Sequence, residues 1–130
     1  MNTKFLLGSS ALVMGAAGVT ATFLPQELLA ALHLPAAGVP VLLIQLHAAL
    51  LLAFGIANWM AKGSLMGGIY NRPLALGNLI HFAIGAITLC KFAASSRPPF
   101  IVVAAAIYVA FAIGFGLVVF SSPSQVPAES

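Results

Sequence analysis

The stretch VLLIQLHAALLLAFGIANWMA, residues 41–61, decides the fold class of this chain. It contains no Asp, Glu, Lys or Arg, and about 20 apolar residues in a helix are enough to cross the ~30 Å hydrocarbon core of a bilayer. Three further runs of the same kind occupy residues 5–24, 73–90 and 99–120. The sequence therefore predicts four transmembrane helices.

The composition indicates the same class. Hydrophobic residues make up 62% of the chain and charged residues 5%, whereas soluble domains carry roughly 25% charged residues. We expect one all-α domain over residues 1–120, an up-down four-helix transmembrane bundle, followed by a disordered tail rich in Ser and Pro at residues 121–130. A net charge of +3 carried by so few residues orients a membrane protein and does not indicate nucleic-acid binding.

The first run has two interpretations. Lys4, the apolar stretch after it and the small residues Val19-Thr20-Ala21 resemble a secretory signal with its cleavage site. The run is as long as a membrane span, however, and longer than the apolar region of most signals, so we expect a retained first helix. The run also holds Ala11, Gly15 and the pair Gly8 and Gly18, so two of its faces are small enough for another helix to approach closely.

The order of the elements predicts the topology. Leucines recur at helical spacing after Pro25, which predicts a short helix in the membrane interface between the first two spans. Four spans place both termini on one side, together with the loop that holds Lys62 and Arg72. That side has three basic residues and the other side two, so the positive-inside rule predicts cytoplasmic termini.

Candidate binding residues are the polar side chains inside the spans, because unpaired polar groups are costly in hydrocarbon and face the bundle interior. Asn58 and Asn78 are predicted to lie within ~3 Å of the same level, so their amides should pair. The expected ligand-binding set comprises Gln45, His47, Asn58, Asn78 and His81. The residues expected at lipid headgroups are Lys62, Tyr70 and Arg72.

A redox alternative uses His47 and His81 to hold a haem or to bind a quinone. Counted from the hairpin, the two histidines differ by ~9 Å along the helix axes, whereas axial haem ligands should be level. We therefore expect no cofactor and no metal. The single cysteine, Cys90, excludes an internal disulfide and a CxxC motif. A carboxylate-coupled exporter is disfavoured, because no acidic residue lies between Glu27 and Glu129.

The fourth run carries a surface suited to helix contact. Ala106, Ala110 and Gly114 form a small-xxx-small stripe, used either within the chain or between chains. Tyr108 lies close to this stripe and is placed to bond across it. The preferred function is binding or assembly, with a membrane lipid, a small apolar ligand, or the partner helices of a homo-oligomer or larger complex. A membrane enzyme or redox subunit is the alternative.

The segment NWMAKGSLMGGIYNRP, residues 58–73, is followed by Gly77-Asn78 and His81-Phe82. In these residues the chain resembles an uncharacterised family of small four-transmembrane-helix bacterial membrane proteins. The resemblance covers roughly the middle half of the chain and is specific in the hairpin. It implies a location in the bacterial inner (plasma) membrane and no established activity, so it assigns no functional residue.

Overall fold

The computed structural model describes residues 2–64, 71–96 and 98–121. In these parts every regular element is a helix and there is no strand. The helices are α1 (Thr3–Phe23), α2 (Pro25–Ala31), α3 (Val39–Ala61), α4 (Arg72–Ser96) and α5 (Pro99–Ser121). All except α2 are long and apolar enough to cross a membrane. The all-α class and the four predicted spans are confirmed, and the chain is a multi-pass membrane protein.

Proline marks the start of every helix after the first. The four residues, each at the first or second helical position, are Pro25, Pro40, Pro73 and Pro99. Proline fits there because the N–H groups of the first turn have no partner within the helix, and because its fixed φ is already helical. The bounds of α1, α3 and α5 differ from the predicted runs by at most two residues.

α4 extends well beyond the predicted third span. The prediction ended at Cys90 because Lys91 introduces a charge, but the helix continues to Ser96. A charge does not end a helix, since a lysine side chain can reach the headgroups while its backbone stays helical. The next residues with a strong effect on the backbone are Pro98 and Pro99, which cannot continue a helix.

The short helix predicted after the first span is α2, and it ends in a Schellman motif. The His33 N–H donates to the Ala30 carbonyl oxygen at 2.9 Å, and the Leu34 N–H donates to the Leu29 carbonyl oxygen at 2.9 Å. His33 has a φ of 57°, in the left-handed region that favours glycine. The motif reverses the chain so that α2 packs on α3.

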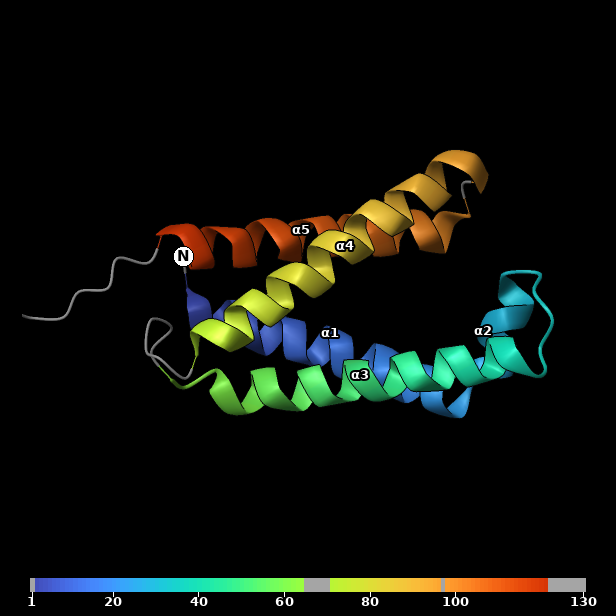
Figure 1. Ribbon diagram of the computed structural model, residues 1–130, viewed down its shortest axis with the longest axis horizontal. Helices are drawn as coiled ribbons and strands as arrows, with labels where there is room; N and C mark the ends of the chain where they lie inside the picture. Colours follow the sequence, from blue (N-terminus) through green and yellow to red (C-terminus); the bar gives the residue numbers. More distant parts are fainter. Residues whose placement is uncertain (1, 65–70, 97, 122–130) are drawn as a thin grey trace, which may run out of the picture. The chain divides into compact units, whose positions relative to one another are not determined.

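The chain divides into two compact units. Unit 2 is Leu7–Lys62, in which α1 and α3 run antiparallel side by side (Figure 1). Unit 1 comprises Met1–Leu6 and Gly63–Ser130 and is built on the antiparallel pair α4 and α5 (Figure 1). The single domain over residues 1–120 stays a prediction. Ser121 belongs to α5, and the rest of the predicted tail lies outside the described residues.

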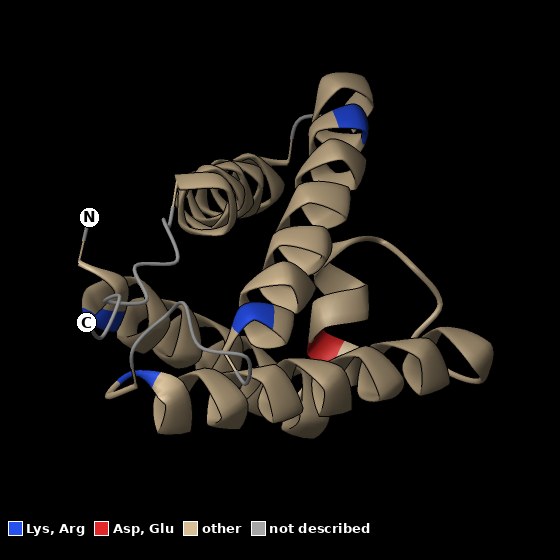
Figure 2. Ribbon diagram, turned by 60° about the vertical axis from the view of Figure 1, so that its left-hand side comes forward, with Lys and Arg blue, Asp and Glu red and all other residues tan. Residues whose placement is uncertain are grey.

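Charged side chains are few and lie towards the ends of the long helices or on α2 (Figure 2). In the described residues they are Lys4, Glu27, Lys62, Arg72 and Lys91. Large apolar side chains along the spans are exposed, among them Leu43, Ile84 and Phe120. This distribution is the one expected of helices that face lipid.

Candidate functional site

A buried hydrogen-bonded pair joins α1 to α3. The Asn58 side-chain nitrogen donates to the Ser10 hydroxyl oxygen at 3.0 Å, and the Ser10 hydroxyl donates to the Leu7 carbonyl oxygen at 3.0 Å. The same amide nitrogen lies 3.7 Å from the Met14 sulfur. Ser10 and Asn58 have no exposed surface, and polar groups in hydrocarbon must find such internal partners. The pair fixes the level of α1 against α3.

Small residues let the backbones of α1 and α3 approach closely beside this pair. A Cβ atom added at Gly55 would lie 3.1 Å from the Gly15 nitrogen and 3.2 Å from the Ala11 carbonyl oxygen. A Cβ added at Gly18 would lie 2.8 Å from Leu52 Cγ. Membrane helices pack closely through Gly and Ala in this way. Close approach to another helix is thus found at Ala11, Gly15 and Gly18, and that helix is α3. At Gly8 no described contact of this kind is found, and a Cβ added there would meet no atom within 4 Å.

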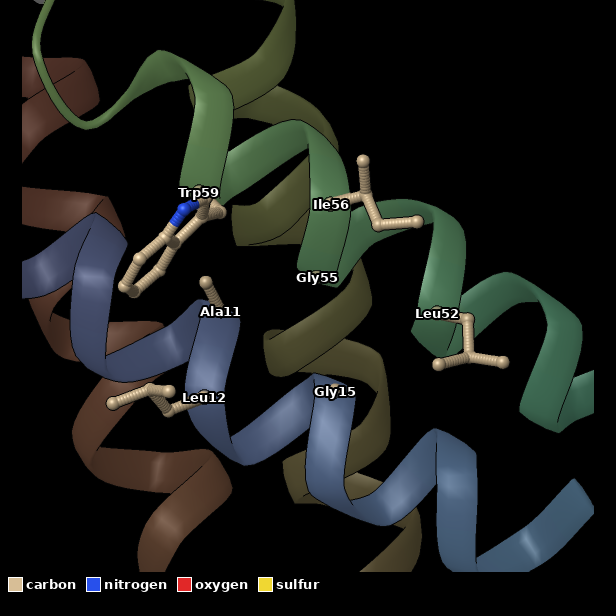
Figure 3. A pocket seen from close by; sticks show the side chains of 7 residues that line it. All are labelled: Ala11, Leu12, Gly15, Leu52, Gly55, Ile56 and Trp59. Carbon is tan, nitrogen blue, oxygen red and sulfur yellow. The ribbon is translucent and has the colours of Figure 1, made fainter. Parts of the chain in front are cut away.

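The surface next to this contact is hollowed into a groove, which we call the α1/α3 groove. Its volume is about 280 Å³, just below the roughly 300–1,000 Å³ of small-molecule pockets. It is open along one side and its lining is almost wholly apolar. The lining residues are Ala11, Leu12, Gly15, Leu52, Gly55, Ile56 and Trp59 (Figure 3).

Two features give the groove its form. Gly15 and Gly55 leave bare backbone at its middle, while the Trp59 ring extends from α3 towards α1 at one end (Figure 3). A Cβ added at Gly15 would meet no atom within 4 Å. The groove therefore exists because residue 15 has no side chain, and a large side chain there would fill it.

A cation lies at the Trp59 end of the groove. Lys62 is the C-cap of α3 and its Nζ lies 2.7 Å from the centroid of the Trp59 ring, where the face of the indole attracts a positive charge. The sole carboxylate side chain of unit 2 is Glu27, on α2, which lies towards the opposite end of α3 (Figure 1). Within unit 2, therefore, no side-chain carboxylate neutralises Lys62.

The predicted ligand-binding residues belong to two different units. Those on α3 of unit 2 are Gln45, His47 and Asn58, and those on α4 of unit 1 are Asn78 and His81. Gln45 and His47 are exposed, whereas Asn78 is buried and its amide nitrogen donates to the Leu74 carbonyl oxygen at 2.9 Å. The pairing of Asn58 with Asn78, and the joint use of His47 and His81, stay predictions.

His81 takes part in a polar contact between α4 and α5. Its Nε2 lies 3.2 Å from the Tyr108 hydroxyl oxygen, so Tyr108 does bond across to a neighbouring helix. Gly85 makes room for the Tyr108 ring, because a Cβ added there would lie 2.5 Å from two of the ring carbons. The buried Phe82 packs edge-on against the same ring, with 5.1 Å between centroids. The contacts of Tyr108 with His81 and Phe82 hold α4 against α5 in unit 1.

The residues predicted to meet headgroups have different surroundings. Lys62 is half-buried against Trp59. Arg72 is exposed at the first position of α4. Tyr70 lies outside the described residues. Of the three, only Lys62 is placed by a described contact beside an apolar groove.

A second groove, of about 710 Å³, runs between α4 and α5. Its lining includes Cys90 and two residues of the predicted stripe, Ala106 and Ala110. The third stripe residue, Gly114, is buried, and a Cβ added there would lie 2.8 Å from Leu6 Cδ1. The stripe is thus divided between packing within unit 1 and an open apolar surface.

The described residues contain no group of three His, Cys, Asp or Glu side chains that could hold one metal ion. The expected absence of a metal or cofactor stays a prediction. No protein-family model, curated protein or solved structure matches this chain. The geometry of the grooves and of the polar contacts is therefore the basis on which a function can be proposed.

Sequence reasoning missed several residues of the α1/α3 site, among them Ser10 and Trp59. Ser10 was not among the polar candidates, although it lies one turn before Met14 and next to the small residue Ala11, a pattern typical of helix contacts. Trp59 was not selected either, because it is not one of the polar residues inside the spans on which the candidate set was based. The signal for its role was Lys62, one turn further along the same helix.

Proposed function

We propose that the protein acts by binding within the membrane, and that the α1/α3 groove takes the hydrocarbon chain of a lipid or of another slender apolar ligand. The supporting observation is the groove itself, an apolar hollow with Gly15 and Gly55 at its middle and Trp59 at one end. Protein interiors are otherwise closely packed. A hollow maintained by glycine at a position that tolerates a side chain is consistent with an occupant.

The proposed location is a bacterial inner membrane with both termini in the cytoplasm. The resemblance of the hairpin region and the three-to-two distribution of basic residues support this location. Along α3 the groove extends from Leu52 to Trp59, which is about 10 Å of helix. It therefore occupies one leaflet, the one at the Lys62 end of α3, which is the cytoplasmic leaflet in this topology.

Native mass spectrometry of the protein released from gentle detergent tests this function. We expect the wild type to retain a stoichiometric lipid or apolar ligand, and Gly15→Leu to lose it because the leucine side chain fills the groove. Gly8→Leu is the matched control, since Gly8 lies on the same helix, lines no part of the groove, and a Cβ added there would also meet no atom within 4 Å.

Two results would contradict the proposal. One is a wild-type protein that retains no ligand, and the other is a retained ligand that Gly15→Leu leaves in place. A retained haem or quinone that is lost on His47→Ala or His81→Ala would instead favour the redox alternative.

Assembly through the α4/α5 groove is a second proposal, favoured by the exposure of Ala106 and Ala110 on that surface. Small residues exposed along a span allow a partner helix to approach closely. Cys90 lines the same groove and is the sole cysteine, so mild oxidation of a homodimer joined there should yield a disulfide-linked pair. Ala106→Leu should abolish that product, and a product that persists would exclude this surface.

A further inference from the structure

We infer that the α1/α3 groove selects a lipid with an anionic headgroup, and that Lys62 binds the headgroup while the chain lies along Gly15 and Gly55. This inference rests on the proposed binding function of the groove. The lipid chain would supply the apolar contact that the groove offers, and a headgroup phosphate would supply the negative charge that unit 2 lacks at Lys62.

The depth of Lys62 suits a headgroup contact. α3 has 23 residues and is about 34 Å long, slightly more than the hydrocarbon core is thick. Lys62 follows its last residue and therefore lies at the level of the headgroups. Trp59, one turn earlier, marks the end of the groove. A chain descending from a headgroup at Lys62 would enter the groove directly.

The surroundings of Lys62 also favour an anion. Its ammonium group lies over the ring of Trp59, and Trp59 lines the groove, so the positive charge is close to one end of the groove. Glu27 is the sole carboxylate side chain of unit 2 and lies towards the other end of α3. A phosphate at Lys62 would therefore meet a positive charge that no side chain of its own unit compensates.

The α4/α5 groove has no described contact between a lysine ammonium group and one of its lining residues. Lys91 follows Cys90 in the chain, but it is exposed and is not among the residues that line that groove. Lys62 does not line its groove either, but its Nζ contacts the ring of Trp59, which does. The two lysines thus have the same charge and a similar place near a span end, and they differ in this contact with a groove-lining residue. Lys91 is consequently a matched control for Lys62.

Fluorescence of Trp59 provides the test, because Trp59 is the only tryptophan and lines the groove. The protein is reconstituted in bilayers that contain a fixed fraction of brominated phosphatidylglycerol or of brominated phosphatidylcholine, and the ratio of quenching gives the relative affinity of the two lipids. One lysine near a membrane surface contributes roughly 1 kcal/mol with anionic lipid, so we expect about a five-fold preference for phosphatidylglycerol.

The variants assign that preference to a residue. We expect Lys62→Gln to reduce the ratio towards one, Lys62→Arg to retain it because arginine keeps both the charge and the contact with the indole, and Lys91→Gln to leave it unchanged. Circular dichroism of each variant confirms that the helices are intact. A preference that survives Lys62→Gln overturns the inference.

Failure of this inference is distinguishable from failure of the proposed function. If the wild type shows no headgroup preference while Gly15→Leu still removes a retained lipid, the groove binds chains and the role of Lys62 is wrong. If neither effect is found, both proposals fail. A stoichiometric dimer in which Trp59 is shielded from both brominated lipids would show that a second copy fills the groove, and would overturn both.

Discussion

The Asn58 amide nitrogen and the Ser10 hydroxyl oxygen lie 3.0 Å apart, and neither side chain has any exposed surface. A shift of α1 along α3 by one turn would separate them and break this bond between the two helices, at a cost because both groups lie in an apolar environment. The bond therefore sets the level at which Gly15 meets Gly55, and with it the position of the groove.

Replacing Ser10 and Asn58 with alanine, singly and together, should reveal a coupling energy of about 0.6 kcal/mol, the average for hydrogen bonds between membrane helices. Unfolding in mixed detergent micelles, followed by Trp59 fluorescence, measures it. Thr20→Ala is the control partner for Asn58→Ala, because the Thr20 hydroxyl donates within its own helix to Ala16 at 2.8 Å. If Thr20 showed the same coupling energy with Asn58 as Ser10 does, the proposed hydrogen bond between Ser10 and Asn58 would be refuted.

Gly55→Ala should destabilise unit 2 by about 1–3 kcal/mol, the usual effect of overpacking. The added methyl would meet backbone atoms of Ala11 and Gly15 at 3.1–3.3 Å, and backbone cannot rotate away as a side chain can. Gly8→Ala, with open space around the new atom, should be neutral or slightly stabilising. The same unfolding assay measures the free energy of unfolding of both variants. If α1 and α3 were not in contact, Gly55→Ala and Gly8→Ala would have the same effect.

Tyr108→Phe should destabilise unit 1 by about 0.6 kcal/mol through loss of the hydrogen bond to His81. Gly85→Ala should have a larger effect, because the new atom would lie 2.5 Å from the Tyr108 ring and would displace it. In the Gly85→Ala background the further change Tyr108→Phe should then have almost no effect on the free energy of unfolding. Gly116→Ala is the control, since its new atom would lie 3.7 Å from Leu79 Cδ1, an ordinary contact.

His33→Gly should stabilise the end of α2 by up to about 1 kcal/mol, because glycine adopts the left-handed conformation without steric cost. His33→Val should have the opposite effect, since a β-branched residue is strained there. Hydrogen exchange at the Leu34 amide, which donates to Leu29, reports both changes. Faster exchange in His33→Gly than in wild type would count against the motif.

The sequence was most informative where a single residue type has a dominant effect. Runs without charge located all four spans, and proline located the starts of the later helices to within two residues. It was less informative about α4, because Lys91 was interpreted as the end of a helix although it ends only the apolar run. Hydropathy measures the solvation of side chains and gives little information on where a helical backbone ends.

The candidate site shows a different limit. Asn58 was selected as a polar residue inside a span and was predicted to pair with Asn78, and its described partner is Ser10 on the first span. Which helices pack together depends on the level of each helix in the membrane and on its rotation about its axis. Hydropathy gives no information on either quantity. The groove was harder still to foresee. It depends on the absence of a side chain at Gly15, and a missing side chain leaves a groove only where two helices are packed at a particular level and rotation.

α4 has 25 residues, about 37 Å of helix against a hydrocarbon core of ~30 Å. Such an excess is accommodated by tilting the helix or by letting its last turns emerge among the headgroups. With Lys91 five residues before the helix end and Ser95 and Ser96 at that end, emergence needs no burial of charge. We therefore expect the protein to fit bilayers over a range of thickness, and a thicker membrane to draw the Cys90 end of its α4/α5 groove further into the hydrocarbon.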